Sequence, residues 1–182
     1  MAAITAAEIL HKYSVKAGAA GNSTLSTAAG SLGKYISTSV WAGGVLNDLF
    51  DDISGAENTA LTVDYRCIFV HNSNTLNALQ TPVVYISAET AGGASIALAS
   101  DNVATSALGA TAAQAAEILT ETTAPVGTSA FASPTTIGTG IALSSIPIGQ
   151  VKAYWVRRTA ANSAALTGDG VTIAVTGDTG SA

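Results

Sequence analysis

The arginines and the densest group of carboxylates are the side chains of this sequence most able to do chemistry. The acidic residues at positions 48–64 are Asp48, Asp51, Asp52, Glu57 and Asp64. A guanidinium group fits a carboxylate in a bidentate pair. We therefore predict that at least one arginine pairs with an acid from positions 48–64. The candidate structural or interface residues from these groups are Arg66, Arg157, Arg158, Asp51 and Asp52.

The acidic region does not have the pattern of a calcium loop. Such a loop brings several oxygen ligands together at D-x-[DN]-x-[DN]-G spacing, which the sequence lacks. A solvated acidic loop, or carboxylates paired with arginine, is the better interpretation. We predict no metal site.

Other reactive side chains have no visible catalytic partner. His11 and His71 are far apart in the sequence, and Cys67 lies in the middle of an expected strand. Neither a G-x-S-x-G elbow nor a phosphate-binding loop is present. We predict no cofactor and no enzymatic activity. A glycan hydrolase, the enzyme alternative, would need two carboxylates roughly 5–9 Å apart in a groove, and nothing in the sequence requires that pair.

The aromatic side chains allow two interpretations. Tyr65, Tyr85, Tyr154 and Trp155 could line a sugar-binding surface if they shared one exposed face. Aromatic rings more often fill a core, and core packing is the favoured prediction.

The composition points to assembly and away from nucleic acid and membranes. The 182 residues are only 10% charged and carry a net charge of −5, so phosphate neutralisation is not expected. The sequence has neither a run of about 18 apolar residues nor a signal peptide at residues 1–10. We expect synthesis in a cytoplasm. Because a surface with so few charges risks poor solubility, we expect partners to cover part of it.

Residues 149–159 (GQVKAYWVRRT) form the stretch around which we expect the fold to be organised. β-Branched and aromatic residues predict a strand. Alternation places Val151, Ala153 and Trp155 on one face. Residues 62–72 (TVDYRCIFVHN) predict a second strand that is either covered on both faces or lies at an interface. We expect the two strands in one sheet, as possible neighbours, with Trp155 in the core.

The remaining pattern predicts an all-β protein. Further strands are expected at residues 34–41, 82–89, 95–100, 141–146 and 171–176. Residues 45–50 predict a short strand or one helical turn with Leu46 buried. Residues 54–60 predict a loop, and residues 111–121 a loop followed by a strand. The fold class is an antiparallel β-sandwich, jelly-roll-like, with an extended N-terminal arm.

We divide the chain into an N-terminal arm at residues 1–32 and a sandwich domain at residues 33–182. The arm is rich in Ala, Gly, Ser and Thr, and residues 2–10 could form a short helix capped by Thr5 and Glu8. Tyr13 and Tyr35 are candidate anchors on a neighbouring subunit.

Four stretches resemble a known group of proteins. They are NDLFDDISGAE (residues 47–57), VDYRCIFVHN (63–72), TAPVG (123–127) and IPIGQVKAYWVRRT (146–159). In this order they resemble small β-rich virion structural proteins of tailed bacteriophages, associated with capsid decoration or cement. None of the stretches is a catalytic signature, so the resemblance implies no active-site residue.

The resemblance implies a non-enzymatic virion protein that binds and stabilises the major capsid protein lattice. Its expected location is the outer capsid surface, as a homo-oligomer, most plausibly a trimer. Avidity across many copies would make modest single contacts sufficient. The alternative is a tail- or fibre-associated adhesin that binds a host surface glycan.

Overall fold

The structure is a computed structural model that describes residues 3–17, 24–164, 166 and 168–181. In chain order the elements of these residues are η1 (Ala6–Glu8), β1 (Ile9–Val15), β2 (Tyr35–Val40), α1 (Gly55–Ala60), β3 (Val63–Asn72), β4 (Asn77–Glu89), β5 (Ser95–Ser100), β6 (Ser106–Ala107), η2 (Ile137–Thr139), β7 (Ile141–Ala142), β8 (Gln150–Thr159) and β9 (Val171–Ser181). All strand pairs are antiparallel.

Strands β3 and β8 lie at the centre of the larger sheet. Its order is β2-β1-β3-β8-β5, and β6 also pairs with β8. The register places Cys67 opposite Trp155 and Asp64 opposite Arg158. Trp155 is fully buried. The predicted central strand, its predicted neighbour and the core position of Trp155 are therefore confirmed.

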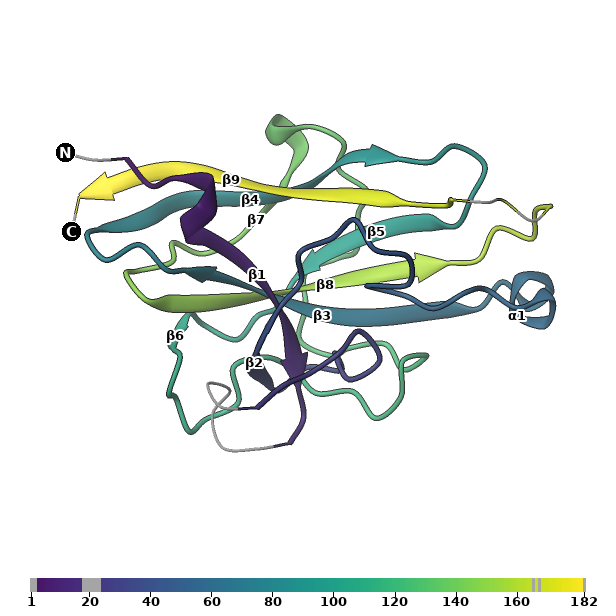
Figure 1. The fold of residues 1–182 in the computed structure, drawn as a ribbon, viewed down its shortest axis with the longest axis horizontal. Helices are drawn as coiled ribbons and strands as arrows, with labels where there is room; N and C mark the ends of the chain where they lie inside the picture. The colour runs from purple at the N-terminus through teal and green to yellow at the C-terminus, as the bar shows by residue number, and fades with distance from the viewer. Residues whose placement is uncertain (1–2, 18–23, 165, 167, 182) are drawn as a thin grey trace.

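The smaller sheet covers one face of the larger sheet. Its order is β7-β4-β9, and Figure 1 shows β4 and β9 running side by side above β3, β5 and β8. Between the sheets lies an apolar core that includes Ile68, Val84, Ile86, Tyr154 and Val156. Two packed antiparallel sheets confirm the sandwich. A jelly roll has eight strands in two Greek keys. The observed sheet orders do not establish that arrangement, so the jelly roll stays a prediction.

Irregular chain covers the other face of the larger sheet. Phe69 and Trp155 pack there against Ile36, Ala115 and Ile118 in a second apolar cluster. Burial of β3 and β8 on both faces follows from large side chains at consecutive positions, as predicted for residues 62–72.

The expectation of a separate arm at residues 1–32 is wrong for residues 9–15. These residues form β1, which pairs with β2 on one side and β3 on the other. The predicted helix over residues 2–10 is also wrong for its described part. The Glu8 carboxylate accepts from the Thr5 N–H at 2.7 Å, but only the single turn η1 forms. Residues 1–2 and 18–23 of the expected arm lie outside the described residues.

Two further predictions are corrected near position 54. Residues 55–60 form helix α1 with Ser54 as its N-cap, where Ser54 Oγ accepts from the Glu57 N–H at 3.3 Å and the Glu57 carboxylate accepts from the Ser54 N–H at 2.8 Å. Residues 45–50 form neither a strand nor a helical turn, and Leu46 is exposed. Residues 111–121 contain no strand beyond an isolated bridge at Glu117.

Candidate functional site

Arg158 holds the acidic loop against the larger sheet. Its Nε and Nη2 donate to Asp64 Oδ2 at 3.1 and 2.7 Å, and Nη2 lies 3.2 Å from Asp51 Oδ1. The guanidinium carbon lies 4.7 Å from the centre of the Phe50 ring. The predicted pairing of an arginine with an acid from positions 48–64 is confirmed.

Arg66 pairs with an acid from another part of the chain. Its Nη2 forms an ion pair with the Glu121 carboxylate, and Nη1 donates to the Tyr65 carbonyl at 3.1 Å. Its guanidinium also lies 5.3 Å from the Phe50 ring centre. Phe50 is therefore in contact with the guanidinium groups of both Arg66 and Arg158, so both arginines hold the acidic loop.

Arg157 points to the opposite face from Arg158, because successive side chains of a strand alternate. Its guanidinium lies 5.1 Å from the Phe131 ring centre, and the Phe131 ring meets the Tyr65 ring edge-on at 5.5 Å. No carboxylate of the described residues lies within 4.0 Å of it, and its buried Nε has no hydrogen-bond partner there. Arg157 is thus the arginine that the described chain leaves without an ion pair.

Trp155 is fixed by Asp101, a residue that the sequence analysis did not single out. The indole N–H donates to Asp101 Oδ2 at 2.8 Å, and the same oxygen accepts from the Ala116 N–H at 2.9 Å. Asp101 Oδ1 accepts from the Val103 N–H at 2.8 Å. The buried Lys152 ammonium donates to the Asp101 carbonyl at 2.6 Å, and burial lowers its pKa. Asp101 follows β5 directly, where the sequence indicated only a loop. Its contact with Trp155 could therefore not be predicted from its position.

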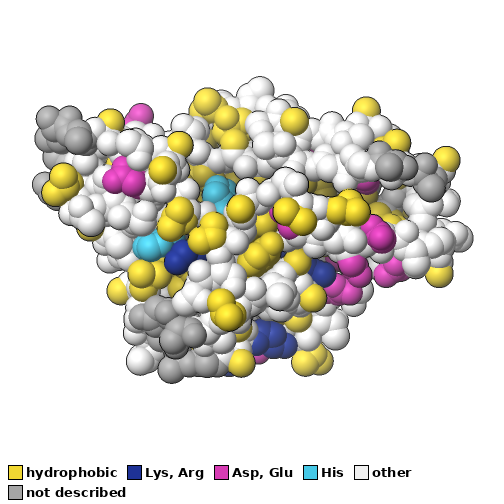
Figure 2. All heavy atoms as spheres, viewed as in Figure 1, with side chains coloured by type: hydrophobic (Ala, Val, Ile, Leu, Met, Phe, Trp, Pro, Cys, Tyr) yellow, Lys and Arg dark blue, Asp and Glu magenta, His cyan; other side chains and the backbone are white. Residues whose placement is uncertain are grey.

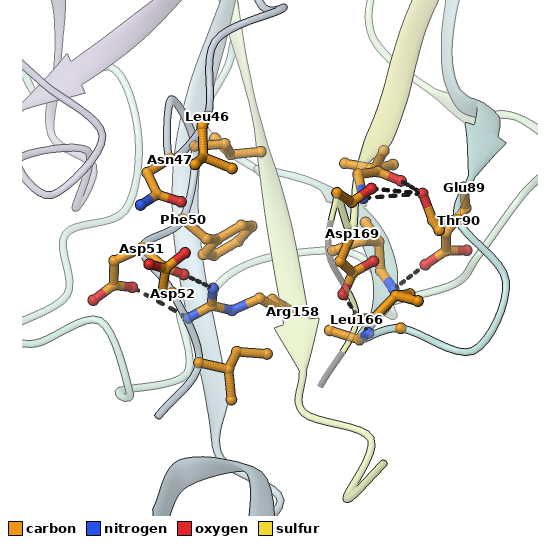
Figure 3. Close-up of a pocket in the computed structure, with 18 of the residues that line it drawn as sticks. Leu46, Asn47, Phe50, Asp51, Asp52, Glu89, Thr90, Arg158, Leu166 and Asp169 are labelled. Carbon is orange, nitrogen blue, oxygen red and sulfur yellow. Dashed lines mark hydrogen bonds and ion pairs between the residues drawn. The ribbon is translucent and has the colours of Figure 1, made fainter. Parts of the chain in front are cut away.

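A cavity opens at the end of the sandwich between the acidic loop and the chain before β9. It has a volume of about 1020 Å³. Figure 3 shows Asp51 and Arg158 on one wall and Glu89, Thr90 and Asp169 on the other. The carboxylate of Glu89 accepts from the Ile96 N–H, and that of Asp169 from the Ala94 N–H, each at 2.7 Å. These two acids therefore hold the connection between β4 and β5.

The described lining of this cavity is acidic. It contains five carboxylates and one guanidinium, which already pairs with acids, in the set Asp48, Asp51, Asp52, Glu89, Asp169 and Arg158. Such a lining favours cationic or neutral polar groups over anions. No group of three or more His, Cys, Asp or Glu side chains among the described residues is arranged to hold a metal ion.

The histidines lie in different surroundings, with His71 buried and His11 partly buried. His11 Nδ1 lies 2.9 Å from the Tyr154 hydroxyl, and its ring meets Trp41 edge-on at 5.8 Å. Burial lowers the pKa of His11 from 6.5 to about 4. Burial, followed by the charge of Lys12, lowers the pKa of His71 from 6.5 to about 4. Neither ring has a partner arrangement that would make it a general base.

The tyrosine anchors contact their own chain. The Tyr13 hydroxyl donates to the Asp48 carbonyl, and its ring packs against the core between the sheets. The Tyr35 hydroxyl donates to the Thr111 carbonyl at 3.4 Å, and the Lys34 ammonium lies 5.6 Å from its ring centre. Tyr13 was expected to anchor the chain on a neighbouring subunit. Its contact with Asp48 gives it an alternative role within its own chain, which is to fix the acidic loop.

The aromatic residues considered for sugar binding do not share an exposed face. Tyr154 and Trp155 are fully buried on opposite faces of the larger sheet, and Tyr65 is buried. Tyr85 lies on the smaller sheet and is half-buried. Core packing, the favoured prediction, is confirmed for Tyr65, Tyr154 and Trp155.

Two nucleophile candidates are engaged or inaccessible. Cys67 is fully buried, and this burial raises the pKa of its thiol well above 9.0. Ser31 and Lys34 have Ser-x-x-Lys spacing, but the buried Ser31 hydroxyl donates to the Thr27 carbonyl at 3.1 Å. The Lys34 ammonium lies 3.2 Å from Glu117. Neither side chain faces the other as a nucleophile and its base would.

Among the described residues, no helix is long and apolar enough to cross a membrane. Comparison of the chain with protein-family models, with curated proteins and with solved structures found no match. The function must therefore be argued from the sequence and the geometry alone.

Proposed function

We propose that the protein is a non-enzymatic structural protein of a bacteriophage virion, in which it decorates the capsid and stabilises the major capsid protein lattice. The sequence resemblance over residues 47–57, 63–72, 123–127 and 146–159 suggests this class. The proposed location is the outer capsid surface.

The observation that carries the proposal is the number of large apolar side chains on the surface of a chain with few charges. The described residues with the highest exposure of this kind are Val126 (87%), Leu119 (79%), Leu25 (78%), Leu46 (75%) and Val45 (71%). Figure 2 shows hydrophobic side chains spread over one face, with charged groups in only a few places. Exposed apolar groups beside so few charges favour coverage by a partner surface.

The rigid sandwich supports a scaffold role. Both faces of the larger sheet are covered, and Arg158, Asp64 and Lys152 of its two central strands are engaged in ion pairs and backbone contacts. Individually modest contacts suffice on a lattice, because many copies and repeated sites add avidity.

Binding to empty shells tests the proposal. Shells assembled from the major capsid protein of the encoding phage, without this chain, are mixed with purified protein and sedimented. We expect saturable binding at a fixed ratio to the capsid subunit. The variants Leu46→Ser, Leu119→Ser and Val126→Ser should bind more weakly while their thermal unfolding stays near that of the wild type. A Thr122→Ala variant is the exposed control, and it should bind normally.

The tail-associated adhesin is the outcome that would replace this proposal. Protein that does not sediment with shells but binds purified tails, or that gives a clear signal on a glycan array, would overturn capsid decoration.

A further inference from the structure

Arg157 and Asp52 carry opposite charges, belong to opposite faces of the larger sheet, and have no ion-pair partner among the described residues. Arg66 and Arg158 each pair with a carboxylate, but Arg157 has none within 4.0 Å among the described residues. Its Nε is buried without a hydrogen-bond partner in that part of the chain. A buried polar group in this state costs free energy, and the positive charge of this guanidinium is balanced by no carboxylate of the described residues.

The position of Arg157 is preorganised for a planar anion. Its guanidinium lies 5.1 Å from the Phe131 ring centre, and Tyr65 supports that ring edge-on at 5.5 Å. Because the stem of Arg157 is half-buried, little side-chain freedom remains to be lost on binding. A carboxylate matches a guanidinium held in this way.

Asp52 is the complementary group on the acidic loop. It is exposed, and it forms no ion pair or hydrogen bond with the rest of the described chain, whereas its neighbour Asp51 pairs with Arg158. The same loop exposes Val45 and Leu46 at 71% and 75%. An exposed carboxylate beside exposed apolar groups has the composition of an interface element.

Arg157 and Asp52 do not pair within one molecule because they belong to opposite faces of the larger sheet. Arg158 contacts Asp51 on the face that carries Phe50 and the core between the sheets. Arg157, one residue earlier on β8, is directed to the face covered by Phe131. The two complementary surfaces are therefore available to different copies of the chain at the same time.

We propose that the chain self-associates head to tail, with Asp52 of one copy forming an ion pair with Arg157 of the next. This inference deepens the proposed function, on which it rests for the expectation of a homo-oligomer. Because different surfaces meet, the contact is heterologous, and it closes into a ring such as a trimer or continues as a filament. The exposed Val45 and Leu46 of the loop would be covered beside the ion pair.

Charge reversal on each side of the contact provides the test. Sedimentation velocity of the wild-type chain should show an oligomer at micromolar concentration. The variants Arg157→Glu and Asp52→Arg should each weaken association. The protein concentration at the midpoint should rise by at least about tenfold, an effect in the range for close charge pairs. The double variant Asp52→Arg with Arg157→Glu should recover association, because every contact between its copies then carries the reversed pair.

The control variant is Asp178→Arg, which reverses an exposed carboxylate on β9 that accepts from the Thr81 hydroxyl. It should associate as the wild type does. If Arg157→Glu does not fold, Asp52→Arg alone tests the same contact, because it changes only an exposed loop. Combining Asp52→Arg with Arg157→Gln should not restore association.

Three results would overturn the inference: a monomeric wild type, single variants that associate normally, or a double variant that does not recover association. The shell-binding assay separates this failure from failure of the proposed function. A monomeric chain that still saturates shells would leave capsid decoration in place and remove only the head-to-tail contact.

Discussion

Arg158 Nη2 lies 2.7 Å from Asp64 Oδ2, and the two residues sit directly opposite each other on β8 and β3. Both side chains are nearly inaccessible, with exposures of 8% and 5%. The pair is thus a cross-strand contact of the two central strands, and it also carries the acidic loop through Asp51.

Removing one member of this pair should destabilise the protein strongly. Arg158→Met leaves the Asp64 carboxylate buried without its partner, and breaking a buried pair costs about 3–5 kcal/mol. We expect a loss of that size in the free energy of unfolding, measured by urea titration. The double variant Arg158→Met with Asp64→Leu should recover part of the loss. A single-variant loss below about 1 kcal/mol would show that the pair is unimportant for stability.

Asp101 should matter more than its loop position suggests. Asp101→Asn places an amide N–H against the donors of Trp155 and Ala116, or against that of Val103, whichever way the amide turns. We expect a loss of at least about 2 kcal/mol in the free energy of unfolding, since an unsatisfied buried group costs roughly 1–3 kcal/mol and a charged one more. Asn102→Asp is the adjacent exposed control, and equal stability of both variants would contradict the role of Asp101.

The buried histidines should make stability fall on mild acidification. The pKa of His11 and of His71 is about 4 in the folded protein and 6.5 by reference. Below pH 6.5 the unfolded chain therefore binds protons that the folded chain does not, and stability is lost between pH 6.5 and about 4. Each histidine can contribute up to about 3 kcal/mol over that range.

Unfolding at pH 7.5 and pH 5.5 checks this expectation above the range in which most carboxylates titrate. His71→Gln should lose less stability than the wild type between these two values, because one of the two titrating rings is absent. An unchanged free energy of unfolding in the wild type would contradict the burial of both rings as neutral groups.

Cys67 should be inert in the folded protein. Its thiol is fully buried and its pKa is raised by that burial, so little thiolate is available. A thiol-reactive dye should label the chain completely in denaturant and hardly at all under native conditions. Rapid native labelling would show that the sheet around Cys67 opens locally.

The central strands were predictable from sequence because large side chains at consecutive positions indicate a strand that is buried on both faces. Residues 149–159 and 62–72 combine β-branched and aromatic side chains, and both became central strands. The partner of Arg158 was predictable for a similar reason, since the acids at positions 48–64 were dense and the cations few.

The N-terminal segment shows where local signals mislead. The reciprocal contact of Thr5 and Glu8 forms, yet the next residues enter the sheet as β1. Pairing on both sides of β1 supplies more hydrogen bonds than one more helical turn would, so tertiary pairing overrides the local preference. At α1 the same signal, Ser54 with Glu57, did mark a helix, but Gly55 and the short length favoured a loop.

The contacts of Arg157 and Asp101 could not be predicted, because they depend on irregular chain. Phe131, Ala116 and Val103 reach the sheet from the segments between β5 and η2, where no hydrophobic period indicates a partner. Only the folded path of those segments brings them to Trp155 and Arg157.

Imaging of the intact virion by electron cryomicroscopy tests the central claim most directly. Capsid decoration predicts density for the sandwich on the outer surface of the shell, repeated with the symmetry of the capsid lattice. Density for this chain confined to the tail or fibres, or a particle without the chain, would contradict it.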